Sequence, residues 1–481
     1  MSTDKTIAKY QPVIGLEVHA QLSTKTKIYN SDANSFGDAP NTNVSVITLA
    51  HPGTLPKLNK KVVEYAIRMG LACNCEISRW QIFDRKNYFY PDLPKGYQLT
   101  QDRTPICKGG YITIKTKDGV EKNIPLNRIH IEEDAGKSMH LEGQNESVLD
   151  FNRAGTALIE IVTEPAIRTS EEAGLILTEI RKLVRYLDIC DGNMEEGSLR
   201  CDANVSIMPV GSTVFGKKVE VKNMNSIRNV QRAIDHEIER QSKETDNGNA
   251  IFSETRLFEP NSGKTFGMRA KEELNDYRYF PDPDLSPLEV SEAWLNAIKA
   301  SMPELPKALY TKYIKTYKIP EYDAAVITDS REVALYFEEI CTYTRNYKAA
   351  SNWVMGPVKS YQNEHDKLPL SPKVIAELIA LIDEGKINFS VASQKIFPEL
   401  LLNASQSPVE VATRLNLLQE SSDDSILPIV KDVIKEFPLK VEEYKNGKKA
   451  IITMFMGEVM KRSKGKADPK RATELLVENL K

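Results

Sequence analysis

The chain has few of the features that assign a function locally. Its 481 residues include only six cysteines, and none of these form a Cys-x-x-Cys pair. This pattern excludes a disulfide-dense secreted domain and favours reduced, cytosolic thiols. Cys73 and Cys75 have no partner nearby at zinc-site spacing, so we interpret them as buried small side chains rather than zinc ligands.

Long apolar runs and net charge are also missing. No stretch is long enough to span a bilayer, and the N-terminal residues lack the apolar core of a signal peptide. We therefore expect a cytoplasmic protein with no membrane contact. The formal net charge is -3, from 64 basic and 67 acidic residues, so only local charge clusters can indicate nucleic-acid binding. The length predicts two or three domains.

The glycine motifs that bind phosphate are absent. Gly136-Lys137-Ser138 and Gly263-Lys264-Thr265 both resemble the end of a Walker A loop, but Ile131 and Phe258 stand where its first glycine is needed. There is no Gly-x-Gly-x-x-Gly fingerprint either, which excludes the common nucleotide-binding loops. Lys137 remains a candidate point charge for a phosphate.

What the chain does contain is a series of alternating strands. In residues 150–165, DFNRAGTALIEIVTEP, Glu160 and Glu164 share one face of an apolar strand that Pro165 ends. A carboxylate there is costly unless a cation, a donor or water meets it. Similar strands are predicted at residues 14–22, 110–117 with 122–125, 128–138, 195–207 and 218–225.

These strands predict an antiparallel sheet with one apolar face and one polar face. Carboxylates and an imidazole on the polar face suit Mg²⁺ or Mn²⁺ better than zinc, and such an ion beside cations suits phosphoryl transfer. That Glu17, His19, Glu132 and Glu160 meet in one pocket is an expectation for the structure to test. The polar face also carries Arg200, Asp202, Asn204 and Lys222.

Two segments combine aromatic, basic and proline residues: FDRKNYFYPDLPKGYQ at 83–98 and DYRYFPDP at 276–283. Aromatic rings can stack on bases while cations meet phosphates. The alternative is a loop whose rings pack on the domain, and the sequence does not separate the two.

Helical spacing dominates after Pro287, and a basic segment follows a linker-like stretch at Asn403. Residues 445–471 hold nine cations against two acids, a local charge of +7 that fits phosphate-backbone binding. A solvated helix face is the alternative. We predict an α+β protein with a large domain at 1–290, an all-helical domain at 291–404 and a small helical tail domain at 405–481.

Seven motifs, in this order, resemble the B subunit of the aspartyl/glutamyl-tRNA amidotransferases. They are VIGLEVHAQL, FDRKNYFYPDLPKGYQ, HIEEDAGKS, NRAGTALIEIVTEP, EEGSLRCDANVS, DYRYFPDPDL and FMGEVMKRSKGKADP, and they span the chain from about Val13 to its C-terminus. The resemblance implies a cradle domain with a kinase-like site, a helical domain and a tRNA-binding tail. It also implies two partners, an amidase subunit and a small third subunit of the same amidotransferase.

The implied chemistry uses ATP and Mg²⁺ to phosphorylate the side-chain carboxylate of Glu or Asp misacylated on tRNA, after which ammonia displaces phosphate. Which misacylated tRNA is the natural substrate stays open. By motif, Glu17, His19, Glu132 and Glu160 would be the catalytic and metal-binding residues. The phosphate or acceptor-end residues would be Lys137, Arg153, Arg200, Asp202, Asn204, Lys222 and Asn223, and the tRNA-body residues Lys461, Arg462, Lys464 and Lys466. The competing hypothesis is a non-catalytic RNA-binding or assembly protein.

Overall fold

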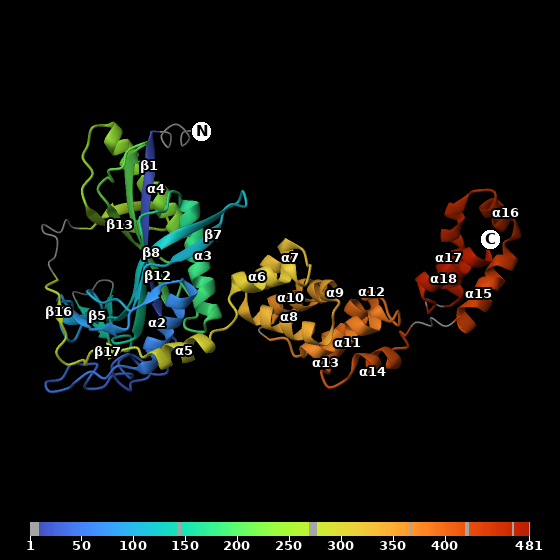
Figure 1. The fold of residues 1–481 in the computed structure, drawn as a ribbon, viewed down its shortest axis with the longest axis horizontal. Coiled ribbons are helices and arrows are strands. Elements are labelled where there is room, and N and C mark those ends of the chain that lie inside the picture. Colours follow the sequence, from blue (N-terminus) through green and yellow to red (C-terminus); the bar gives the residue numbers. More distant parts are fainter. Residues whose placement is uncertain are drawn as a thin grey trace. The chain divides into compact units, whose positions relative to one another are not determined.

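The computed structural model describes residues 9–141, 146–268, 277–365, 367–418, 423–463 and 466–480. The chain forms two compact units, Met1–Leu305 and Pro306–Lys481 (Figure 1). The first unit contains every strand of the described chain, and the second is helical. The α+β class predicted from the sequence is confirmed. The further division of the chain at residue 404 stays a prediction.

A ten-stranded sheet organises the first unit. Its order is β15-β14-β13-β12-β1-β11-β8-β6-β2, and β7 pairs with β8 off this path. The strands are β1 (Tyr10–Gln21), β2 (Glu76–Ile77), β6 (Cys107–Lys108), β7 (Tyr111–Lys115), β8 (Glu121–Glu133), β11 (Ala157–Thr163), β12 (Leu199–Pro209), β13 (Val219–Met224), β14 (Glu254–Glu259) and β15 (Lys264–Gly267).

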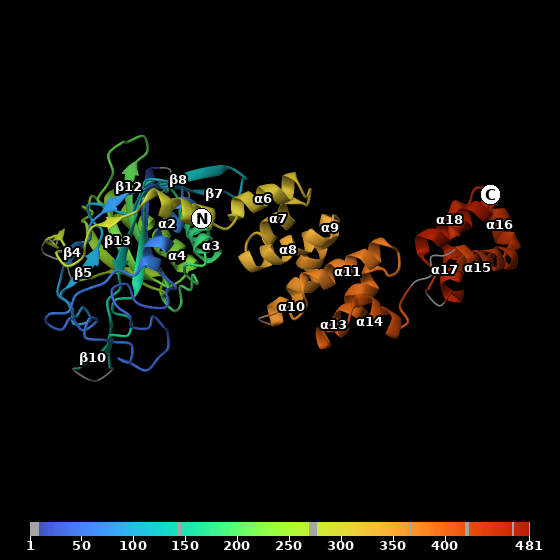
Figure 2. The same cartoon turned by 60° about the horizontal axis from the view of Figure 1, so that its bottom comes forward.

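The predicted alternation is confirmed on the central strands. On β1 the side chains of Ile14, Leu16, Val18 and Ala20 are fully buried, and the intervening polar residues are half-buried. The buried set packs with three helices that lie along the apolar face of the sheet (Figures 1 and 2). These helices are α2 (Lys60–Ala72), α3 (Ser170–Tyr186) and α4 (Ile227–Asp246). The other face is therefore left for polar side chains.

The strands predicted from the sequence pair antiparallel, as expected, and one additional pair, β13 with β14, runs parallel. A parallel pair needs a crossover, and α4 supplies it between these two strands. Helix α4 and the strands β14 and β15 were not predicted. The cysteines Cys73, Cys75 and Cys107 lie buried in the core, as expected of small apolar side chains.

The two aromatic segments meet in a small second sheet. Its order is β16-β4-β5, formed by β4 (Asp84–Asn87), β5 (Tyr97–Thr100) and β16 (Phe280–Pro281). The three short strands in these segments were not predicted from the sequence. Asp276 lies outside the described residues. Two further pairs join β9 (Lys137–His140) to β10 (Ser147–Asp150) and β3 (Trp80–Gln81) to β17 (Leu288–Glu289).

The C-terminal series of helices begins at α5 (Glu292–Ala300), whose Leu295 and Ile298 belong to the core of the first unit. The second unit contains α6 (Pro306–Lys315), α7 (Glu321–Ile327), α8 (Arg331–Tyr343), α9 (Tyr347–Trp353), α10 (Lys359–Glu364), α11 (Pro372–Asp383), α12 (Phe389–Val391), α13 (Phe397–Leu402), α14 (Pro408–Arg414), α15 (Asp423–Glu436), α16 (Pro438–Lys445), α17 (Ile452–Arg462) and α18 (Pro469–Asn479). Two π-helical segments, Val354–Val358 and Ala392–Ile396, interrupt it.

The last four helices share a core of their own, which includes Val430, Phe455 and Leu476. Asp468 caps α18, because its side chain accepts hydrogen bonds from the backbone N–H groups of Lys470 and Arg471. Ser330 and Ser371 stand at the N-cap positions of α8 and α11, but neither side chain makes a capping hydrogen bond. A search of the described residues finds no helix with the length and apolarity needed to cross a bilayer.

Candidate metal and phosphate site

Strand register brings the polar side chains of four strands into one row. On β1, His19 lies opposite Arg200 of β12 on one side and opposite Glu160 of β11 on the other. Glu160 in turn lies opposite His130 of β8. Because side chains on one face recur every second residue, Glu132 stands next to His130 along β8. The row crosses β12, β1, β11 and β8 at the centre of the sheet.

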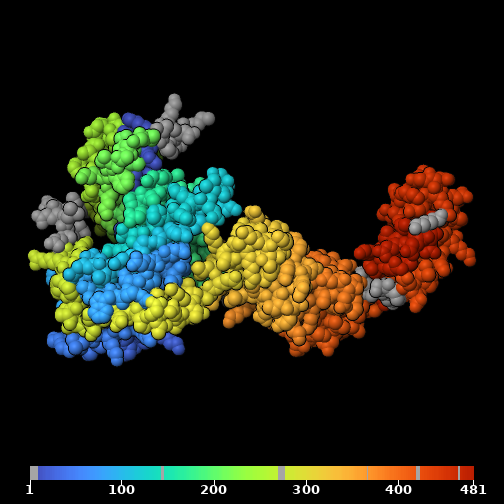
Figure 3. Space-filling view, in the orientation of Figure 1, coloured from blue at the N-terminus to red at the C-terminus, as the bar shows by residue number. Residues whose placement is uncertain are grey.

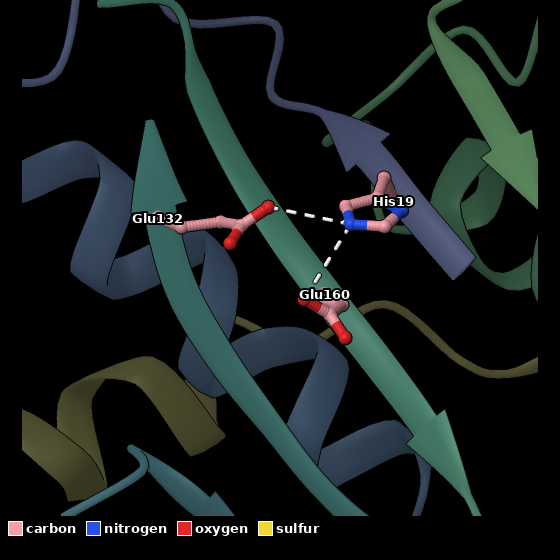
Figure 4. Close-up of side chains that lie close together, drawn as sticks. All are labelled: His19, Glu132 and Glu160. Atoms are coloured by element: carbon pink, nitrogen blue, oxygen red, sulfur yellow. Dashed lines mark ion pairs between the residues drawn. The ribbon is translucent and has the colours of Figure 1, made fainter. Parts of the chain in front are cut away.

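His19, Glu132 and Glu160 point toward one another from three strands (Figure 4). The Nε2 atom of His19 lies 3.4 Å from an oxygen of Glu132 and 3.4 Å from an oxygen of Glu160. One potential ligand atom from each residue lies within 4.8 Å of the others. In the part of the chain that the structure describes, this is the only such group of three or more His, Cys, Asp or Glu residues.

His130 joins the same cluster. Its Nε2 atom lies 3.4 Å from Glu160 and 3.8 Å from Glu132, and its side chain is almost fully buried. Burial would lower the pKa of His130, but hydrogen bonds with Glu132 and Glu160 and their charges raise it to about 9. Its Nδ1 atom is buried and has no hydrogen-bond partner in the described structure. Two imidazoles therefore share two carboxylates here.

The carboxylate at the centre of the cluster is held ionised. Burial alone would raise the pKa of Glu160, but hydrogen bonds from His130 and His19 hold it well below its usual range. Burial alone would lower the pKa of His19, but the hydrogen bond with Glu160 and the charge of Glu132 raise this pKa above its usual value. The Glu160 carboxylate thus keeps its negative charge in a site that is mostly shielded from water.

Glu17 is not part of the three-residue group. It lies opposite Asp202 on β12, and its carboxylate accepts a hydrogen bond of 2.8 Å from the Asn204 amide. Burial raises the pKa of Glu17, and the nearby charge of Glu160 raises it further. The structure therefore places Glu17 close enough to Glu160 for electrostatic interaction, on the same face, one row along β1.

A second charged group borders the cluster around Asp134. Arg200 donates to its carboxylate at 2.7 Å and Gln21 at 2.9 Å, and Arg153 approaches at 3.7 Å. Burial alone would raise the pKa of Asp134, but the positive charges of Arg200 and Arg153 lower this pKa below its usual value. Arg153 also donates to the carbonyl of Gly136 at 2.6 Å, so it fixes the turn that precedes Lys137.

The remaining predicted phosphate and acceptor-end residues are spread along the same part of the sheet. Lys222 bridges Asp202 at 2.7 Å and Glu220 at 2.9 Å. Asn223 has a left-handed backbone, and its amide donates to the Phe258 carbonyl, which indicates a structural role. Lys137 is exposed on β9, outside the ten-stranded sheet. Of this predicted set, Arg200 is the residue that shares a row with the cluster.

Part of the positive charge of the predicted tRNA-body residues is neutralised by nearby acids. Arg462 pairs with Glu436 of α15, and Lys461 lies 3.8 Å from Glu458. Lys466 donates to the Asn416 side chain at 3.1 Å. Lys464 lies outside the described residues. Outside this set, Arg471 also pairs with an acid of another helix, Asp423. Acids from other helices therefore reduce the local charge of +7 that counting along the chain gave.

Sequence reasoning missed His130, Gln21 and Asp134 as site residues. Strand alternation had already put His130 on the outward face with Glu132, and Gln21 with His19. The missing information was the register, which sets His130 against Glu160 and brings Gln21 to Asp134.

The residues present fit a divalent cation. Glu132 and Glu160 offer carboxylate oxygens, the ligands that Mg²⁺ prefers, and His19 adds a nitrogen that Mn²⁺ also accepts. Three protein ligands leave coordination positions for water or phosphate oxygens. Arg200 stands beside the group as a fixed positive charge. The site therefore combines a candidate cation pocket with a guanidinium, and both groups can neutralise phosphate charge.

Comparison with known proteins decides the family. Residues 12–296 match the model of the "GatB/GatE catalytic domain", and residues 335–480 match that of the "GatB domain". The chain belongs to the family of aspartyl/glutamyl-tRNA amidotransferase B subunits. The predicted resemblance is confirmed.

Individual relatives cover almost the whole chain. The B subunit of the aspartyl/glutamyl-tRNA(Asn/Gln) amidotransferase of Synechococcus sp. (strain JA-3-3Ab) is 47% identical over 98% of this chain and 98% of its own length. The corresponding B subunits of Trichlorobacter lovleyi and Geobacter sulfurreducens are both 48% identical, over 98% of this chain and 99% of their own lengths. The candidate site lies within the segment that matches the catalytic-domain model.

Proposed function

We propose that this chain is the part of a glutamine-dependent tRNA amidotransferase that activates the aminoacyl group. It phosphorylates, with ATP, the side-chain carboxylate of Glu or Asp misacylated on the tRNA for Gln or Asn. Ammonia from a partner amidase then displaces phosphate and leaves the amide, and a small third subunit joins the two in the complex. The convergence of His19, Glu132 and Glu160 on the polar sheet face is the observation that carries this proposal.

The chemistry explains why a phosphoryl-transfer site is needed. A carboxylate resists ammonia because its leaving group would be oxide, whereas an acyl phosphate offers a good leaving group. Mg²⁺, held by His19, Glu132 and Glu160, would neutralise charge on the triphosphate. The chain's own residues orient the reactants: Arg200 supplies a positive charge next to His19, and Asp134 holds that guanidinium in place.

Water exclusion follows from burial. Glu132 and His130 are about 95% buried, and Glu160 and His19 are only slightly exposed. An activated acyl group formed here would meet little bulk water, which favours attack by ammonia over hydrolysis. His130, whose Nε2 atom lies 3.4 Å from Glu160, adds a second imidazole that can hold a proton beside the carboxylates.

The test is an amidation assay of the complex reconstituted with its partner subunits. Glu-tRNA(Gln) and Asp-tRNA(Asn) are each supplied with glutamine, Mg²⁺ and either ATP or no nucleotide. We expect amide product only with ATP, and phosphate release that depends on the misacylated tRNA. Amidation that proceeds equally well without ATP would contradict the proposal. Binding of tRNA without any nucleotide-dependent product would favour the non-catalytic RNA-binding alternative.

A further inference from the structure

Next to the candidate site, two distant segments build a surface that the proposed reaction leaves unused. Asn87 at the end of β4 joins them with two hydrogen bonds: its backbone N–H donates to the Tyr277 carbonyl at 2.8 Å, and its side-chain amide donates to the Arg278 carbonyl at 2.8 Å. The pairing of β16 with β4 continues this contact. Figure 3 shows the yellow segment of the chain that contains β16 lying against the blue N-terminal part of the first unit. We call the side chains of Lys86, Tyr88, Tyr277 and Tyr279 the tyrosine wall.

The rings of the wall form a continuous series. The ring centroids of Tyr88 and Tyr277 lie 6.1 Å apart, and those of Tyr277 and Tyr279 lie 6.2 Å apart, both edge to face. The Lys86 ammonium lies 4.8 Å from the Tyr277 ring centre and 5.8 Å from that of Tyr88. One cation is thus held among aromatic faces.

A comparison with the neighbouring Arg85 separates this surface from ordinary packing. Arg85 forms ion pairs with the buried Asp282 and with Asp284, so its charge is used to pin β16 to β4. Within the described ranges, Lys86 has no carboxylate at ion-pair distance, and its charge stays available to an incoming anion. Tyr279 is 40% exposed, so a ring remains open to a flat partner.

The wall adjoins the cluster of carboxylates. Lys86 of β4 lies opposite Gln98 of β5, and the side-chain amide of Gln98 donates to the backbone carbonyl of Glu133, the residue after Glu132 on β8, at 2.7 Å. Arg278, between the two other tyrosines, has a left-handed backbone with φ of 45°. Such a conformation in a non-glycine residue is costly and persists where the surroundings impose it, here through the bond from Asn87.

We propose that the tyrosine wall binds the unpaired 3′ end of the tRNA, and this inference rests on the proposed function. A single strand presents bases and phosphates in alternation. The tyrosine wall offers aromatic rings on which bases can stack and a lysine that can pair with a phosphate. Bases of the 3′ end would stack on Tyr277 and Tyr279. Lys86 would meet a phosphate next to the base on Tyr277, on the side of Tyr88. The esterified amino acid would then reach toward Glu132 and His19.

The experiment uses the reconstituted complex and a tRNA that carries fluorescent 2-aminopurine in place of its last adenine. Stacking quenches this base, and the assay needs no ATP and no amidation. Tyr277→Ala and Tyr279→Ala should each abolish most of the quenching, and Tyr277→Phe should retain it. The matched control is Tyr111→Ala, which removes an exposed tyrosine of β7.

Affinity provides the second measurement. Tyr277→Ala should weaken binding of the full tRNA by about 5- to 150-fold, which corresponds to the roughly 1–3 kcal/mol contributed by one base–aromatic stack. It should leave unchanged the binding of a tRNA that lacks its last three nucleotides. Lys86→Met should lower the salt dependence of full-length binding by about one phosphate contact.

Three results would overturn the inference. The first is equal loss of affinity for full-length and truncated tRNA. The second is loss of ATP binding in place of tRNA-end binding, which would assign the wall to the nucleotide base. The third is failure of the Tyr277→Ala chain to assemble with its partners, which would make the wall an interface between subunits. Normal quenching in a complex that cannot amidate would instead contradict the proposed function alone.

Discussion

Lys27 gives a prediction whose size follows directly from the structure. Its side chain is fully buried, and its ammonium donates to the carbonyls of Asn43 at 2.7 Å and Phe151 at 3.3 Å. These bonds hold the segment that leads to Arg153. Burial lowers the pKa of Lys27 from 10.5 to about 8, although the charges of Asp32, Asp150 and Glu133 oppose the change.

The sign of the effect on stability follows from proton binding. Between about pH 8 and pH 10.5 the unfolded chain binds more protons at Lys27 than the folded chain, so the free energy of unfolding rises with pH in this window. Below it, the full cost of burying the charged amine is present. The lowered pKa corresponds to roughly 3 kcal/mol.

Urea unfolding of the native chain and of Lys27→Met, each measured from about pH 7 to about pH 10.5, tests this. Both proteins carry Trp353→Phe, so that emission from Trp80 and Trp294 reports the first unit. The difference in unfolding free energy should shift by about 3 kcal/mol toward the lysine protein as pH rises. Lys25→Met, an exposed lysine two residues away, is the control and should follow the native profile. Parallel profiles for Lys27→Met and the native chain would refute the reasoning.

Three further predictions concern the site and the tail. Glu160→Gln should lower the rate of amidation by at least about 100-fold, because mutation of residues that only hydrogen-bond to metal ligands already lowers metal affinity or activity by about 10- to 100-fold. Glutaminase turnover by the partner and tRNA binding should persist. Unchanged amidation would exclude Glu160 as a metal ligand. Truncation after Asn403 should weaken tRNA binding in a salt-dependent way while the complex still assembles, as measured by binding at several salt concentrations; equal affinity at low salt would exclude the tail. Asp468→Ala should destabilise the C-terminal helices by about 1 kcal/mol through loss of the α18 cap. The measurement is the midpoint temperature of their thermal unfolding, which should fall, and Lys470→Ala is the control.

The sequence predicted which face each strand residue takes, because the two-residue period of a strand is a local property. The predicted division into an apolar and a polar face is confirmed, because Leu16 and Val18 are buried in the core and His19 and Glu160 lie on the polar face. Register is set by contacts between strands, so the sequence could not show that His130 lies against Glu160.

The effective charge of residues 445–471 could not be predicted for a similar reason, because it depends on contacts between helices. Counting along residues 445–471 ignores acids contributed by other helices, and Glu436 and Asp423 pair with Arg462 and Arg471. Strands β14 and β15 are short and carry charged residues at several positions, so neither alternation nor an apolar run marked them. Their position in the sheet depends on the crossover helix α4, which is a tertiary feature.

The proposed mechanism depends most on one claim, that His19, Glu132 and Glu160 hold a divalent cation. A crystal of the complex soaked in Mn²⁺ and measured near the manganese absorption edge tests this directly. We expect an anomalous peak at about 2–2.6 Å from the carboxylate oxygens of Glu132 and Glu160, bordered by the His19 ring. The claim would be contradicted by a map that has no peak among these three side chains and has a manganese peak elsewhere on the chain, at a site whose loss abolishes ATP-dependent amidation.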